Sequence, residues 1–105
     1  MGSVYLARQD RLDRAVALKV LTASLRADEH LLARFQREAE CASRLTHPGL
    51  ARIYDYGNVD GVPYLAMELV RGRTLGRALV DDGPLAPSRM LVIARELLEA
   101  LAVCH

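Results

Sequence analysis

The stretch Val16-Ala17-Leu18-Lys19-Val20-Leu21 places one lysine inside a run of apolar, strand-forming residues. Because successive side chains of a strand point to opposite faces, Ala17, Lys19 and Leu21 share one face. A buried ammonium without a partner is energetically costly, so Lys19 is expected to meet an anionic group on that face. The alternative is an edge strand whose lysine keeps its ammonium in water.

Residues 28–45 follow a helical pattern, in which apolar side chains recur every three or four positions. The apolar stripe consists of Leu31, Leu32, Phe35, Ala39, Ala42 and Leu45. At about 100° of rotation per residue, Glu38 lies on the packed side of this helix, whereas Glu40 faces solvent. A packed carboxylate needs a cation, and Lys19 is the expected partner. The alternative partner is Arg34 or another arginine nearby.

The remaining pattern predicts three further strands and two further helices. Strands are expected at residues 3–7, 50–56 and 62–69, and the turn Asn58-Val59-Asp60-Gly61 joins the last two. A short helix is expected at residues 74–81. A last helix begins at Pro87 and continues to the chain end, with apolar residues over more than half of its circumference. So broad an apolar face belongs inside a domain.

Composition and charge exclude several classes of function. A formal net charge of +1 over 105 residues gives no electrostatic case for a nucleic-acid or membrane partner. The two cysteines, Cys41 and Cys104, lie far apart without a Cys/His cluster, which indicates reduced thiols in the cytoplasm. No signal peptide is expected, and the apolar residues 90–104 are interrupted by charges. A membrane tether would have to lie in a segment outside this sequence.

In this order and spacing, six segments resemble the N-terminal half of a eukaryotic-like Ser/Thr protein kinase domain of the bacterial type. Met1-Gly2-Ser3-Val4-Tyr5-Leu6-Ala7 resembles the end of the glycine-rich loop, and residues 16–21 resemble the lysine strand. Phe35-Gln36-Arg37-Glu38-Ala39 resembles the C-helix, and residues 45–50 resemble the turn after it. Residues 64–75 resemble the last N-lobe strand and hinge. Residues 97–105 resemble the helix that leads into the catalytic loop.

The resemblance implies an α+β fold in two parts. Residues 1–69 would form a partial kinase N-lobe, with an antiparallel sheet and the C-helix, and residues 70–105 the hinge and two C-lobe helices. With the family's first strand absent, the sheet would have four strands, and residues 3–8 would form an exposed edge. The catalytic base and both metal-binding residues would lie beyond His105.

On the phosphate side, the resemblance implies that Lys19 contacts the α- and β-phosphates of ATP and that Glu38 holds this lysine. The two side chains are expected within salt-bridge reach when the C-helix is swung in, and apart when it is swung out. Gly2 would let the loop backbone approach phosphate, because glycine has no Cβ.

On the adenine side, the resemblance implies that Val4 and Ala17 cover the base and that Met67 is the gatekeeper. The backbone carbonyl of Glu68 and the backbone groups of Val70 would meet the edge of the adenine. For Val4, Ala17 and Met67, ordinary core packing is the alternative interpretation.

The implied activity is transfer of the γ-phosphoryl group of ATP to Ser or Thr hydroxyls of a protein substrate. This reaction uses Mg²⁺, whose ligands would lie outside this chain, so the isolated chain is expected to be inactive. Two alternatives are a truncated, pseudokinase-like regulatory or interaction module, and a non-functional gene fragment.

Overall fold

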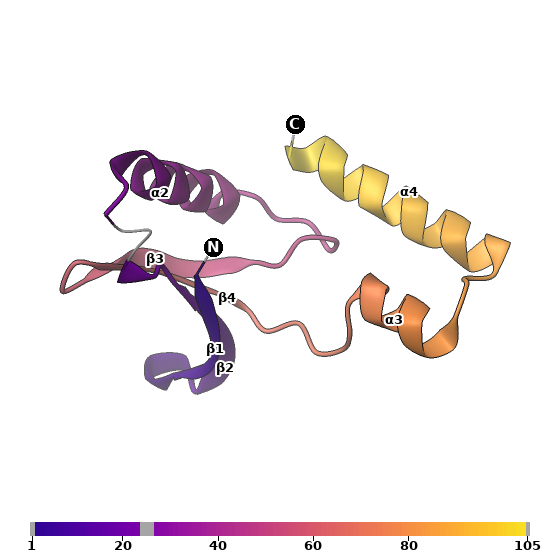
Figure 1. Ribbon diagram of the computed structural model, residues 1–105, viewed down its shortest axis with the longest axis horizontal. Coiled ribbons are helices and arrows are strands. Elements are labelled where there is room, and N and C mark those ends of the chain that lie inside the picture. The colour runs from indigo at the N-terminus through magenta and orange to yellow at the C-terminus, as the bar shows by residue number, and fades with distance from the viewer. Residues whose placement is uncertain (1, 24–26, 105) are drawn as a thin grey trace.

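The computed structural model describes residues 2–23 and 27–104. Met1 and His105, which open and close the motifs above, lie outside the described residues. The elements are β1 (Ser3–Gln9), the 3-10 turn η1 (Asp10–Leu12), β2 (Arg14–Val20), α2 (Glu29–Ser43), β3 (Ile53–Val59), β4 (Val62–Glu68), α3 (Leu75–Asp82) and α4 (Pro87–Cys104). Figure 1 shows α2 above the sheet, with α3 and α4 at the other end of the molecule.

The strands form one antiparallel four-stranded sheet in the order β1-β2-β4-β3. The predicted order of strand, strand, helix, strand and strand is therefore confirmed, and β1 lies at an edge as expected. The lysine strand β2 is internal, so Lys19 does not lie on an edge strand. Helix α2 packs on β3 and β4, which places it over one face of the sheet (Figure 1).

Helix α2 begins where its sequence provides a cap. The Asp28 carboxylate accepts hydrogen bonds from the backbone amides of His30 (2.9 Å) and Leu31 (3.3 Å), which satisfies two of the free N–H groups of the first turn. The predicted apolar stripe faces the sheet, with Ala39 buried at its centre. The helix ends at Ser43, two residues earlier than expected.

The segment after α2 forms a turn, which delays the start of β3. His47 Nδ1 accepts the backbone N–H of Gly49 at 2.9 Å, and the His47 carbonyl accepts the backbone N–H of Leu50 at 3.0 Å. Since these bonds curve the chain through Leu50, the strand expected from residue 50 begins only at Ile53.

The β3–β4 hairpin has a tighter turn than the predicted Asn58–Gly61 loop. Strand β3 continues to Val59, and Asp60 (φ 52°) and Gly61 (φ 80°) make the whole connection. Positive φ at both central residues is the requirement of a type I′ turn, whose twist matches that of the flanking strands.

Strand β3 carries a bulge between Ile53 and Asp55. The Asp55 carboxylate accepts the Tyr64 hydroxyl at 2.9 Å and the backbone N–H of Tyr56 at 2.9 Å. The hydrogen bond to Asp55, with smaller effects of burial and of the Asp55 charge, raises the pKa of Tyr64 above its usual value. Tyr64 therefore stays a hydrogen-bond donor at neutral pH.

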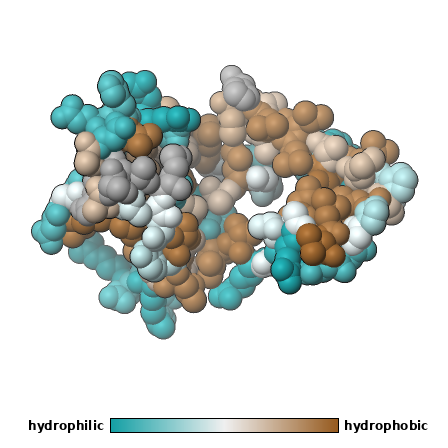
Figure 2. All heavy atoms as spheres, viewed as in Figure 1, coloured by the Kyte–Doolittle hydropathy of each residue, from teal (hydrophilic) through white to brown (hydrophobic). Residues whose placement is uncertain are grey.

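The described core is small, and the chain is extended. Its buried residues are Val16, Leu21, Ala39, Pro63, Ala66, Ala78 and Ala100. The radius of gyration is 16.1 Å, whereas a compact domain of this length has a radius of about 13 Å. Helix α4 exposes Leu91, Leu98 and Leu101, and Figure 2 shows apolar residues gathered over this end of the molecule.

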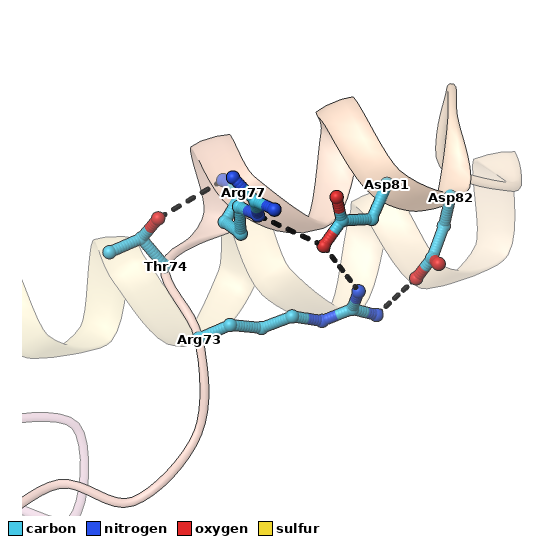
Figure 3. A network of polar contacts seen from close by, with 5 residues as sticks. All are labelled: Arg73, Thr74, Arg77, Asp81 and Asp82. Carbon is cyan, nitrogen blue, oxygen red and sulfur yellow. Dashed lines mark hydrogen bonds and ion pairs between the residues drawn. The ribbon is translucent and has the colours of Figure 1, made fainter.

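A polar network holds α3 to the segment that leaves β4 (Figure 3). Thr74 caps the helix by accepting the backbone N–H of Arg77 at 3.0 Å. Arg73, just before the helix, forms ion pairs with Asp82 and, at 3.6 Å, with Asp81, which Arg77 also contacts at 3.1 Å. Two carboxylates at a helix C-terminus oppose the helix dipole, so these arginines offset an unfavourable charge.

Helix α4 meets the N-terminal half of the chain at Gly49, where an added Cβ would lie 3.0 Å from the Ala100 Cβ and 3.2 Å from the His47 ring. We therefore expect Gly49→Val to destabilise this contact by about 1–3 kcal/mol through overpacking. Hydrogen exchange at the amides around Ala100 would measure the loss of protection.

The matched control is Gly76→Val in α3, where the nearest atom to an added Cβ is the Thr74 Oγ1 at 3.9 Å. Valine and glycine differ by only about 0.5 kcal/mol in helix propensity. Unchanged exchange around Ala100 in Gly49→Val would show that α4 does not dock on this turn.

Candidate functional site

Four of the residues predicted to bind nucleotide share one face of the sheet. Residues directly opposite each other on paired strands lie on the same face. Val4 is opposite Lys19 in the β1–β2 ladder, and Ala17 is opposite Met67 in the β2–β4 ladder. Since Ala17 and Lys19 are two apart in β2, strand alternation places all four on one face.

The lysine end of this face forms a pocket of about 220 Å³ between the sheet and α2. Lys19 and Glu38 both line it, so the tertiary structure brings the two predicted partners to one cavity. The other lining residues are Leu21, Leu31, Arg34, Phe35, Ala39, Ala42 and Leu65. Most of this lining is aliphatic or aromatic, and the charged groups stand out against it.

Within this pocket, Glu38 is bound to Arg34 and not to Lys19. Arg34 Nε donates to Glu38 Oε1 at 3.0 Å, one helical turn away. Among the described residues, Lys19 has no carboxylate within 4.0 Å. The expectation that Lys19 is the partner of Glu38 is therefore corrected for this conformation, which corresponds to the separated arrangement of the pair.

Glu38 pairs with Arg34 because its side chain is exposed to solvent on the surface of α2. The Glu38 side chain is 58% exposed, so it is less packed than the helical pattern indicated. An exposed i,i+4 pair contributes only about 0.3–0.5 kcal/mol, so the bond to Arg34 is weak and local. Lys19 is half-buried at the pocket wall, and a lysine in such a position can bury its aliphatic stem while its ammonium stays in water without a protein partner. Glu40 faces solvent as predicted and pairs with Arg44 at 2.8 Å.

Gly2 lies where only glycine fits. Its φ is 151°, and an added Cβ would be 2.4 Å from the Val20 carbonyl oxygen. Close backbone packing on β2 therefore explains this glycine by itself, and its contact with phosphate stays a prediction.

The predicted adenine-edge residues lie where β4 ends. Glu68 is the last residue of β4, and Val70, which is 70% exposed, follows in the connection to α3. Glu68 makes two contacts with Arg52. Its backbone N–H donates to the Arg52 carbonyl at 2.8 Å, and its carboxylate accepts the Arg52 backbone N–H at 3.1 Å. No sequence pattern indicated the carboxylate contact, because it joins the residue before β3 to the last residue of β4.

Candidate metal ligands are sparse in the part of the chain that the structure describes. Over residues 2–23 and 27–104, no group of three or more His, Cys, Asp or Glu side chains is placed to hold a metal ion. Carboxylate oxygens are the protein ligands that Mg²⁺ prefers, and Glu38 alone lines the pocket near Lys19.

No helix in the described ranges is both long and apolar enough to cross a bilayer.

A four-stranded antiparallel sheet, one helix packed on it, and a strand lysine sharing a pocket with a helix glutamate together define the small lobe of a protein kinase. The chain belongs to the protein kinase domain family, whose model matches residues 1–105. The α+β fold is thus an N-lobe sheet and C-helix followed by the hinge and two C-lobe helices, as predicted.

The relatives are bacterial Ser/Thr kinases. The chain is 45% identical to serine/threonine-protein kinase pkn3 of Myxococcus xanthus and 42% identical to PrkC of Bacillus subtilis. Each match covers 100% of this chain, but only 19% and 16% of those proteins. The crystal structure of the Mycobacterium tuberculosis PknI kinase domain superposes with a TM-score of 0.86 at 36% identity, over 100% of this chain and 43% of that one. The chain therefore spans less than half of each of these relatives.

Proposed function

We propose that this chain is the ATP-binding portion of a Ser/Thr protein kinase that transfers the γ-phosphoryl group to protein hydroxyls. The observation that carries the proposal is the single sheet face that holds Val4, Ala17, Lys19 and Met67. In this proposal Val4 and Ala17 cover the adenine and Met67 is the gatekeeper at the back of its pocket. The Lys19 ammonium binds the α- and β-phosphates beside them.

The roles follow from the chemistry of each group. An ammonium attracts phosphate oxygens as a point charge, and its neighbours determine where it lies. In the proposal, Glu38 leaves Arg34 and holds Lys19 when α2 moves toward β2, and the weakness of an exposed ion pair makes that exchange inexpensive. The backbone groups of Glu68 and Val70 bind the adenine edge, and the Gly2 backbone approaches phosphate.

The proposal divides the chain into a partial N-lobe at residues 1–69 and a hinge with C-lobe helices at residues 70–105. Phosphoryl transfer itself needs metal ligands and a group that orients the acceptor hydroxyl. For the isolated chain we propose nucleotide binding without transfer. Mg²⁺, the protein substrate and the activity belong to a protein that carries the rest of the domain.

The chain offers a direct test, because Lys19 is its only lysine. An acyl phosphate of ATP transfers its acyl group to an amine that lies beside the bound phosphates. We expect this reagent to acylate Lys19 more than an acyl phosphate without the nucleoside does, and free ATP to suppress the reaction. Mass spectrometry of the peptide containing Lys19 would measure both.

Two alanines in β2 give matched variants. Ala17→Leu places extra volume where adenine would lie and should reduce the labelling. Ala15→Leu makes the same change at an exposed position on the same strand and face, and it should not. Equal labelling by the two acyl phosphates, or no competition by ATP, would overturn the nucleotide role and favour the interaction module.

A further inference from the structure

Directly beyond the last pair of the β3–β4 ladder, Arg52 and Glu68 make only one of the two backbone hydrogen bonds that would extend the ladder by one pair. In an antiparallel hydrogen-bonded pair, two opposite residues exchange both N–H···O bonds. Ile53 and Met67 are the last paired residues, and Arg52 and Glu68 are the next residues along the two segments. The bond from the Glu68 N–H to the Arg52 carbonyl is made at 2.8 Å. The return bond, from the Arg52 N–H to the Glu68 carbonyl, is not made. The Arg52 N–H donates instead to the Glu68 carboxylate, at 3.1 Å.

The side chain of Glu68 thus replaces its own carbonyl as the acceptor for Arg52. A backbone N–H at a strand end takes the nearest good acceptor, and hydrogen bonds to charged acceptors are stronger than neutral ones. Because the carboxylate accepts this N–H, the Glu68 carbonyl is kept out of the ladder at the point where β4 ends and the hinge begins.

We infer that the Glu68 side chain is a positioning residue, which keeps the Glu68 carbonyl available to accept a hydrogen bond from the 6-amino group of adenine. The inference rests on the proposed function, since it names a group that makes the same site selective for adenine. Without the carboxylate, the Arg52 N–H turns to the carbonyl, and the adenine amino group loses its acceptor. Glu68 acts through the backbone and does not itself touch the nucleotide.

The test compares two substitutions of similar size in the full 105-residue chain. Glu68→Met removes the acceptor, and Glu68→Gln retains a carbonyl oxygen at the same place. The readout is the concentration of competitor that halves acylation of Lys19. The competitors are ATP and purine riboside 5′-triphosphate, which lacks only the 6-amino group.

We expect Glu68→Met to raise the ATP concentration that halves acylation of Lys19 about three- to tenfold. A change of this size corresponds to the net free energy of one hydrogen bond. Competition by purine riboside triphosphate should not change, and Glu68→Gln should behave like the unsubstituted chain with both nucleotides. A purely structural role would weaken both competitors equally, so that outcome overturns the inference, as does an unchanged ATP value in Glu68→Met.

The unsubstituted chain separates this inference from the proposed function. If it prefers ATP to the purine analogue, the adenine amino group has an acceptor, and the variants decide whether Glu68 positions it. If both nucleotides compete equally, ATP binding stands but the adenine contact is overturned. If neither competes, the proposed function itself is overturned.

Discussion

Lys19→Met is expected to abolish phosphoryl transfer by a protein in which this chain is joined to the rest of its kinase domain. Methionine has a similar length but no charge, so the α- and β-phosphates lose their cationic partner on the sheet. Removing one positioned electrostatic group of this kind costs about a hundred- to thousandfold in rate. A radiolabelled phosphate-transfer assay on a generic protein substrate would measure the loss.

Folding should be nearly unaffected by the same substitution. Lys19 makes no ion pair among the described residues, and a substitution that breaks no buried contact changes the free energy of unfolding by only about 0.5 kcal/mol. The matched control is Arg14→Met, which removes a cation from the same strand, where the guanidinium lies 3.5 Å over the Tyr54 ring. Arg14→Met should cost about 0.5–1 kcal/mol of stability and retain transfer. Full activity of Lys19→Met would rule out its phosphate role.

Helix α4 is expected to make the isolated chain self-associate. Leu91 and Leu98 are 68% and 67% exposed, and Leu97 and Leu101 on the same helix are also exposed. Burying apolar surface stabilises an assembly by about 25 cal/mol per Å². A contiguous exposed apolar face therefore favours association between copies of the chain. Light scattering should show oligomers at micromolar concentration, and a chain ending at Gly83 should show much less association.

A paired substitution locates the effect on the helix. Leu91→Gln with Leu98→Gln should lower the association, whereas Val59→Gln, at an exposed apolar position beside the β3–β4 turn, should not. A monomeric chain that unfolds cooperatively in urea, and loses stability on removal of residues 84–105, would contradict this expectation. It would mean that α4 is packed within the chain in solution.

Much of the fold was predictable because its signals are local. The alternation around Lys19 predicted β2, the spacing of Leu31 and Phe35 predicted α2, and Pro87 marked the first residue of α4. The predicted boundaries were wrong at the ends of some elements, because competing hydrogen bonds determine where a strand or helix begins and ends. His47 holds the backbone of Gly49 in a turn, so β3 starts three residues later than its apolar pattern suggested.

The candidate site was predictable only as a set of residues. Strand register brought Val4, Ala17, Lys19 and Met67 to one face, and the family match agrees with the motifs that named them. The contact between the Glu68 carboxylate and the Arg52 amide was not predictable. It depends on how β3 and β4 meet beyond a bulge, and neither residue carries a pattern that reports this.

By itself, the sequence determined which segments are strands and helices, their order and the kinase class, because these depend on side-chain periodicity and on motifs in fixed spacing. Only the tertiary structure decided the partner of Glu38. Helical geometry offers it Arg34 one turn away, and the position of α2 over the sheet governs whether Lys19 can compete. The two alternatives are both carboxylate–cation pairs of similar, small energy, so no residue pattern distinguishes them, and the placement of one helix does.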